Sequence, residues 1–233
     1  MGVFTLRFLP TPVWGEVQGQ GELLLDWMSG ELKEWVDENL PVLTDREHTF
    51  IGGSSMGGLM ALYAGGRYSS VYSRAACLSP YLGLVMEPLC EDLDEAWIEE
   101  DTQFYISWGG METGTQEELA QITADNLTIQ RILEDKASVY LHCYPEGTHC
   151  EACWEEETPV WMEEIRDPAA VLGGNRMINF VLISPHFPSN YWLFARALKN
   201  SRRARAGDCR HDRWNPCRKH CGQCWTTWSA STR

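Results

Sequence analysis

Hydrophobic residues recur at helical spacing over residues 21–40, with acidic residues between them. This pattern predicts an amphipathic helix. Four later runs are short and rich in β-branched and aromatic residues, which is typical of buried strands: HTFIG, RAACLS, TQFYISWG and SVYLHCY. Helix-like patterns follow these strands, at residues 57–65, 89–100, 116–135 and 151–165. Strands that alternate with helices in this way predict an α/β fold, in which a mostly parallel sheet is flanked by helices.

A glycine-rich turn joins the first of these strands to its helix. Residues 53–57 read Gly-Ser-Ser-Met-Gly, a G-x-S-x-G motif in a strand–turn–helix context. In such a turn the central residue, Ser55, projects its hydroxyl above the edge of the sheet, and the Met56 N–H faces the oxygen that becomes charged. The motif makes Ser55 a candidate nucleophile. A tight turn with a solvated serine is the alternative interpretation, and the motif alone leaves both open.

A serine nucleophile needs a base within hydrogen-bonding reach. His149 follows the last of the four strands and precedes a helix, and loops at the carboxyl ends of strands carry the chemistry of open α/β sheets. His142 lies inside a strand pattern, His48 stands beside charged residues, and the other three histidines are C-terminal. His149 is therefore the predicted base. A helix-start histidine bonded to local backbone is the alternative interpretation.

The base in turn needs an acid that orients it, and in hydrolases of this type the acid lies between serine and histidine in the sequence. Glu112 is the first acidic residue after the strand QFYISWG. Asp101 precedes that strand and Glu117 already belongs to the next helix, so both fit less well. Because acidic residues are abundant in this half of the chain, Glu112 is the least constrained of the three predicted residues.

Three segments resemble the signature blocks of a family of α/β-hydrolases that includes enterochelin esterases and esterase D-like enzymes: IGGSSMGGLMALYAGGRYSSVYSRAACLSP, YISWGGMETGT and YPEGTHCEACWEE. The resemblance covers about residues 14–165. It implies that Ser55, Glu112 and His149 are the catalytic residues, with Trp154 completing the histidine motif. It also implies a serine hydrolase that cleaves a small-molecule carboxylic ester and needs no metal or organic cofactor.

The front of the chain departs from this family. Family members carry several strands and a long loop before the segment that corresponds to residues 21–42, and that loop supplies the second oxyanion-hole donor. Only about 20 residues precede this segment here, so we expect residues 1–170 to form an incomplete, N-terminally truncated α/β-hydrolase domain with an exposed sheet edge. Losing one oxyanion donor costs about 10²–10³ in rate, so a hydrolase fold without turnover is an alternative.

The composition fits a globular protein with a sizeable core, since 44% of the 233 residues are hydrophobic. No apolar run approaches the roughly 20 residues that span a membrane, and the N-terminus lacks the pattern of a secretory signal. The cysteines number nine, an odd count without regular spacing, which favours thiols in a reducing compartment. The sequence therefore predicts a cytoplasmic protein with no membrane partner.

The charge of the chain, −14 overall, changes abruptly near Val171. Residues 171–233 contain 11 Lys or Arg and 2 Asp or Glu, whereas residues 1–170 contain 8 and 31. A basic segment of this kind can bind nucleic acid, and four of its cysteines could hold zinc: Cys209, Cys217, Cys221 and Cys224. Cys209 and Cys217 are farther apart in the sequence than paired zinc ligands usually are. We therefore keep a zinc and nucleic-acid-binding module as the alternative only, and we expect no nucleic-acid partner.

Within this C-terminal segment, residues 177–200 resemble the first strand and helix of an ATP-grasp ligase. The strand is predicted at residues 179–183 and the helix at residues 190–198. After Asn200 the resemblance stops, and enrichment in Arg, Cys and Trp is typical of out-of-frame translation, so we infer a frameshift. We expect the chain beyond Asn200 to be disordered. Removal of residues 171–233 should leave the thermal stability and any esterase activity of the hydrolase domain unchanged or improved.

Overall fold

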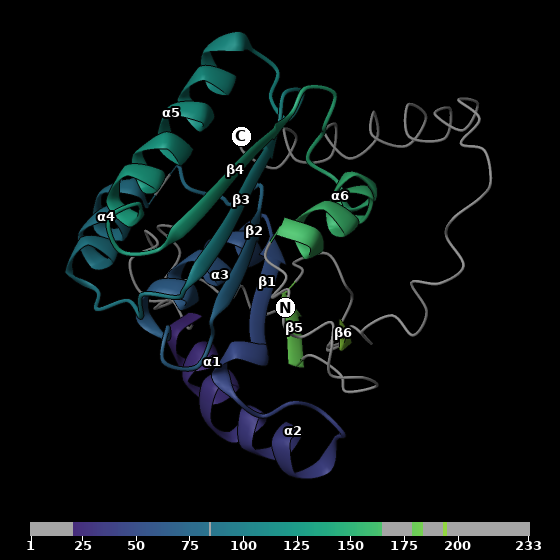
Figure 1. Cartoon of the computed structure of the whole chain (residues 1–233). Helices are drawn as coiled ribbons and strands as arrows, with labels where there is room; N and C mark the ends of the chain where they lie inside the picture. Colours follow the sequence, from purple (N-terminus) through teal and green to yellow (C-terminus); the bar gives the residue numbers. More distant parts are fainter. Residues whose placement is uncertain (1–20, 84, 165–178, 184–192, 195–233) are drawn as a thin grey trace, which may run out of the picture.

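The computed structural model of the chain describes residues 21–83, 85–164, 179–183 and 193–194. Within these ranges six strands form one sheet in the order β4-β3-β2-β1-β5-β6 (Figure 1). The strands are β1 (Thr49–Ser54), β2 (Arg74–Leu78), β3 (Gln103–Gly109), β4 (Ser138–Tyr144), β5 (Asn179–Ile183) and β6 (Leu193–Phe194). The first five run parallel, and β6 pairs antiparallel with β5.

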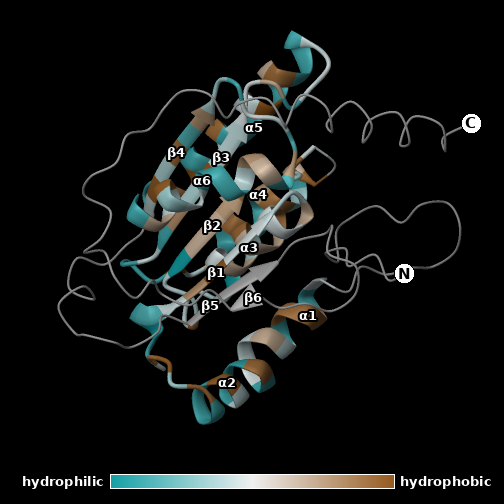
Figure 2. Cartoon of the chain, turned by 90° about the vertical axis from the view of Figure 1, so that its right-hand side faces the viewer, coloured by the Kyte–Doolittle hydropathy of each residue, from teal (hydrophilic) through white to brown (hydrophobic). Residues whose placement is uncertain are grey.

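Helical segments precede β1, separate β1 to β4 from one another and follow β4. They are α1 (Gly21–Trp27), η1 (Met28–Leu32), α2 (Lys33–Asn39), η2 (Arg46–His48), α3 (Met56–Arg67), α4 (Met86–Glu95), α5 (Gln116–Leu133) and α6 (Glu151–Glu164). The first three are contiguous and form the amphipathic helix predicted over residues 21–40, with a π-helical turn at its centre. Figure 2 shows hydrophobic and hydrophilic residues mixed around α1 and α2, as a helix with one buried face requires.

The four strands and the helices between them lie where the sequence pattern predicts them, so the predicted α/β class is confirmed. The largest shift concerns α4, which spans residues 86–95 rather than 89–100. It begins before Pro88, because proline is tolerated in the first turn of a helix, where its missing N–H has no intrahelical acceptor. It ends where Ala96 adopts an extended backbone conformation.

Alternate residues along the strands face two separate cores. Ile51, Cys77 and Phe104 lie in the larger cluster, which also holds buried residues of α1, α3, α4 and α5. Their neighbours Phe50 and Tyr105 point the other way and pack with Trp154 and Trp161 of α6, among others. Helix α6 therefore covers one face of the sheet, while α3, α4 and α5 cover the other (Figure 1). The side-chain alternation of a strand explains why one sheet builds both cores.

The edge of β1 is paired, contrary to the expectation of an exposed sheet edge. Strand β5 lies parallel to it, with five residues in register from Thr49 opposite Asn179 to Gly53 opposite Ile183. A bare parallel strand would leave a row of unpaired N–H and C=O groups, and β5 satisfies those of β1. The strand predicted at residues 179–183 is therefore confirmed, and it belongs to the same sheet as the hydrolase strands.

The prediction of a helix at residues 190–198 is wrong at the centre of this range. Leu193–Phe194 form β6, which pairs antiparallel with Val181 and Leu182 of β5, because the outer edge of β5 offers backbone partners that outweigh local helix propensity. The expectation of disorder after Asn200 and the four cysteines of the zinc alternative lie outside the described residues. None of the described helices is both long and apolar enough to cross a bilayer.

Candidate active site

Ser55 occupies the turn between β1 and α3 in a strained backbone conformation. Its φ is 56° and its ψ is −117°, a combination that non-glycine residues rarely adopt. Two backbone contacts hold it there: its N–H donates to the Leu78 carbonyl at 2.9 Å, and its carbonyl accepts from the Tyr81 N–H at 3.1 Å. Strain of this kind costs about 1–3 kcal/mol and is found where a side chain must be displayed in one direction. Met56, the predicted oxyanion donor, follows directly as the first residue of α3.

Gly58 explains the glycine-rich sequence after the serine. A Cβ atom built at this position would lie 2.7 Å from the Leu78 carbonyl oxygen and 3.1 Å from the Pro80 Cα. Both are backbone atoms, which cannot move away without shifting the end of β2. The first turn of α3 therefore approaches β2 so closely that only glycine fits, and this approach fixes where the Ser55 side chain stands.

The structure brings the three predicted residues together from the ends of β1, β3 and β4. The Ser55 Oγ lies 2.9 Å from His149 Nε2, and His149 Nδ1 lies 3.2 Å from Glu112 Oε2. Both distances suit hydrogen bonds. The Glu112 side chain is only 5% exposed, whereas that of His149 is 29% exposed, so the acid is buried behind a base that solvent and ligands can reach.

The other candidates weighed at the sequence level have different partners. Asp101 accepts a hydrogen bond from Arg46, and Glu117 is exposed in the first turn of α5. The His48 ring contacts Asp45, and His142 lies against Tyr144 with ring centroids 4.1 Å apart. His149 and Glu112 differ from these alternative candidates because they contact each other and because His149 also contacts Ser55.

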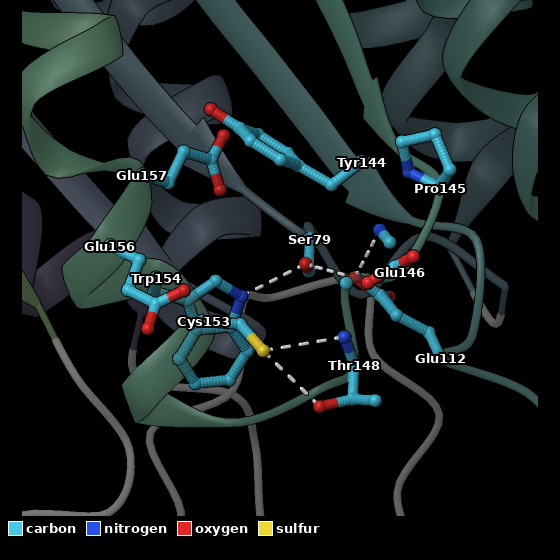
Figure 3. Close-up of a pocket in the computed structure, with 12 residues that line it drawn as sticks. Ser79, Glu112, Tyr144, Pro145, Glu146, Thr148, Cys153, Trp154, Glu156 and Glu157 are labelled. Atoms are coloured by element: carbon cyan, nitrogen blue, oxygen red, sulfur yellow. Dashed lines mark hydrogen bonds between the residues drawn. The ribbon is translucent and has the colours of Figure 1, made fainter. Parts of the chain in front are cut away.

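Two further residues hold the Glu112 carboxylate, and no pattern in the sequence indicates either role. Ser79 donates to Glu112 Oε1 and accepts from Trp154 Nε1 at 2.9 Å (Figure 3). The Gly109 N–H donates to the same carboxylate oxygen at 2.6 Å. Ser79 has a φ of 44° and is 4% exposed. Trp154 also packs edge-on against the His149 ring, with centroids 5.0 Å apart. Only the folded chain brings these residues together.

Close backbone packing joins the loop after β3 to the loop after β4. A Cβ atom at Gly109 would lie 2.2 Å from the Gly147 carbonyl oxygen, so the two loops touch at this point. The Gly110 N–H donates to the Tyr144 carbonyl at 2.6 Å, and the Met111 N–H donates to the Gly147 carbonyl at 2.9 Å. Glu112 comes directly after the contacting residues of the first loop, and His149 comes shortly after those of the second. The packing of the two loops therefore sets the distance between Glu112 and His149.

Comparison with known proteins places the chain in a family. The sequence profile of the Putative esterase family matches residues 15–160. The chain belongs to this family. No curated protein sequence was found to match it.

Two solved structures of hydrolases share the fold of this esterase-family chain. Enterobactin and Salmochelin Hydrolase IroE matches with a TM-score of 0.50 and 19% sequence identity, over 66% of this chain and 60% of that one. Siderophore hydrolase EstB from Aspergillus nidulans matches with a TM-score of 0.51 and 18% identity, over 71% of this chain and 66% of that one. This chain therefore spans 60–66% of the length of these two structures. The predicted α/β-hydrolase fold is confirmed.

A cavity of about 430 Å³ lies beside the acid of this esterase-family site (Figure 3). Its lining includes Glu112, Ser79 and Trp154 but not Ser55, so it lies behind the three-residue cluster rather than at the serine. Glu157 of α6 also lines it and is 4% exposed. Burial raises the pKa of Glu157 to about 7, and the charge of Glu112 acts in the same direction. Burial thus favours the neutral form of this carboxyl, which limits the negative charge beside Glu112.

Replacing Ser79 with alanine should lower kcat/KM for ester hydrolysis by about 10–100-fold, because a hydrogen bond to a charged group contributes about 1.5–3 kcal/mol. The substitution keeps the Cβ atom but removes the hydroxyl that donates to Glu112. Steady-state kinetics with a small chromogenic ester measure this change.

Ser69→Ala is the matched control. Ser69 is also buried, and its hydroxyl donates to the Trp97 carbonyl at 3.2 Å, away from the Ser55 cluster. Each substitution removes a hydroxyl that makes two hydrogen bonds, so both variants should lose some thermal stability, but only Ser79→Ala should lose rate. Equal kinetic losses in the two variants would mean that the Ser79 effect is a general loss of stability.

Proposed function

We propose that this chain is a serine hydrolase that cleaves carboxylic esters through Ser55, His149 and Glu112. The observation that carries the proposal is the 2.9 Å contact between the Ser55 Oγ and His149 Nε2. Membership of the esterase family supports the same reaction class. The strained turn at Ser55 and the buried carboxylate on the other ring nitrogen supply the geometry that such a nucleophile needs.

The reaction follows from these contacts. The Ser55 Oγ attacks the carbonyl carbon of the ester while its proton passes to His149 Nε2. Glu112 accepts a hydrogen bond from Nδ1–H, which fixes the tautomer and stabilises the imidazolium that forms. The Met56 N–H, at the start of α3, donates to the oxyanion of the tetrahedral intermediate. Collapse of the intermediate expels the alcohol, which takes the proton from Nε2. Water then attacks the acyl-enzyme by the same route and releases the acid.

The proposed substrate class is a small-molecule carboxylic ester. Two structures with this fold carry names that describe hydrolysis of enterobactin, salmochelin or other siderophores, and those names concern those proteins. For this chain we propose the shared chemistry, ester cleavage without a metal or organic cofactor. We further propose that it acts in the cytoplasm. The five cysteines that the structure describes are thiols, which supports a reducing compartment.

A fluorophosphonate probe tests the nucleophile directly. The probe should label the full-length chain covalently at Ser55, because only a serine activated by a base attacks phosphorus at neutral pH. Peptide mapping of the labelled protein identifies the site. Labelling should disappear in Ser55→Ala.

Ser54→Ala provides the matched control, since Ser54 is the adjacent serine and ends β1. Its substitution should leave probe labelling within a few fold of the original rate. Labelling that persists in Ser55→Ala would assign the nucleophile to another residue. A folded protein that is not labelled at all would instead be a hydrolase fold without turnover.

A further inference from the structure

Two cysteines follow the histidine of the proposed site in a Cys-x-x-Cys arrangement. Cys150 follows His149 directly, and Cys153 lies in the first turn of α6. Their sulfur atoms are 3.5 Å apart. Among the five cysteines that the structure describes, contact between two sulfurs is seen only here, whereas Cys77 is fully buried and Cys143 is exposed on β4.

Thr148, on the other side of the histidine, contacts both sulfurs. Its Oγ1 lies 3.3 Å from the Cys150 Sγ and 3.2 Å from the Cys153 Sγ, and its N–H donates to the Cys153 Sγ at 3.4 Å. Figure 3 shows the two contacts between Thr148 and Cys153. The three residues thus form one cluster around the backbone of His149. Any change in the bonding of the two sulfurs acts on the residues immediately before and after the base.

We propose that Cys150 and Cys153 are a redox modification site, whose disulfide displaces His149 and slows the reaction of Ser55. The effect on rate rests on the proposed function, whereas formation of the disulfide does not. A disulfide bond is about 2.05 Å long, so the sulfurs must approach by roughly 1.5 Å, a movement within reach of side-chain rotation. Forming the bond draws the Cys153 sulfur away from the Thr148 N–H or draws Thr148 with it.

The oxidant is a low-molecular-weight disulfide such as oxidised glutathione. The Cys150 thiolate attacks one sulfur of oxidised glutathione, which breaks the S–S bond and releases one glutathione thiolate. The Cys153 thiolate then attacks the Cys150 sulfur and displaces the second glutathione. Two electrons leave the protein thiols, and their two protons convert both leaving thiolates to glutathione. Cys150 is assigned the first attack because burial raises the pKa of the Cys153 thiol, which lowers its thiolate fraction.

The disulfide is tested by peptide mapping of the full-length protein after incubation with oxidised glutathione. Cleavage after glutamate cuts at Glu151, between the two cysteines, and at Glu146, which separates Cys143 from them. An internal disulfide then holds two short peptides, GTHCE and ACWE, together until a reductant is added. The expected result is this linked pair. Glutathione attached separately to each cysteine, without the linked pair, would overturn the proposal.

The effect on the histidine is tested by two readouts. The His149 imidazole resonances, assigned by comparison with His149→Gln, should shift on oxidation of the original chain but not of Cys150→Ser. The rate of fluorophosphonate labelling at Ser55 should fall at least about tenfold and recover with reductant, since a 1 Å misplacement costs on the order of 10²-fold. Cys143→Ser is the matched control and should respond like the original chain.

The outcomes separate this inference from the proposed function. If oxidation produces the linked peptides and shifts the His149 resonances, but the reduced protein is never labelled at Ser55, the redox site is supported and the proposed esterase function is contradicted. If Ser55 is labelled but oxidation changes neither the His149 resonances nor the labelling rate, the esterase function is supported and the redox proposal is overturned.

Discussion

Replacement of His149 with alanine is expected to lower kcat for ester hydrolysis by about 10⁶-fold, the loss seen when the same role is removed from a serine protease. The Ser55 Oγ has its contact with His149 Nε2 at 2.9 Å, and without that nitrogen the hydroxyl proton has no acceptor during attack. Pre-steady-state and steady-state kinetics with an activated ester measure the loss. KM should change little, because the imidazole acts on the transition state more than on bound substrate.

His142→Ala is the control for this substitution. His142 lies on β4, seven residues earlier, with its ring stacked against Tyr144 and no contact with Ser55. Its removal should change kcat less than threefold, a difference of about 0.65 kcal/mol in the barrier. If His149→Ala lowered kcat by less than tenfold, the base would have to be another residue or solvent.

The three residues of the site were predictable because each carries a local signal. Ser55 stands in a motif that dictates a strand, a strained turn and a helix, and the structure has all three. His149 and Glu112 each follow the end of a strand, and parallel strands bring their carboxyl ends to one edge of a sheet. The order of strands then decides that these ends meet. Local pattern and general topology therefore predict that these three side chains lie close together, as the structure has them, while their catalytic roles stay a prediction.

The residues that hold Glu112 were not predictable in the same way. Ser79 lies 33 residues before Glu112 and 75 before Trp154, and its role depends on a positive φ and on the packing of α6 against the sheet. No spacing in the sequence indicates such contacts. A serine at the end of a strand looks like any turn residue until the side chains around it are known.

The pairing of strand β5 could not be predicted from the sequence either. The apolar run at residues 179–183 predicts a strand, but hydrophobic pattern does not name the partner of a strand. The partner is β1, the strand that ends in the turn of Ser55. Charge and family resemblance alone predict that this segment is independent of the hydrolase domain, yet backbone pairing makes it part of the same sheet.

Removal of residues 171–233 is therefore expected to destabilise the protein, contrary to the expectation from sequence alone. The deletion unpairs β1 along the five residues in register with β5, and each lost hydrogen bond contributes about 0.5–1.5 kcal/mol. A loss of several kcal/mol in the free energy of unfolding corresponds to a fall of about 10 °C in Tm for a chain of this size. Differential scanning calorimetry measures this fall. The exposed β1 edge should also promote aggregation.

A shorter deletion separates the contribution of β5 from that of the basic segment. Removing only residues 195–233 retains both β5 and β6 and still eliminates most of the basic residues of the C-terminal segment. This variant should keep its Tm within about 2 °C of the full chain, whereas the longer deletion should lose about 10 °C. Because β1 leads directly into Ser55, the longer deletion should also slow fluorophosphonate labelling at temperatures where the protein is still folded. Equal Tm values for the two deletions would mean that β5 adds nothing to the sheet, and the independence of residues 171–233 would then stand.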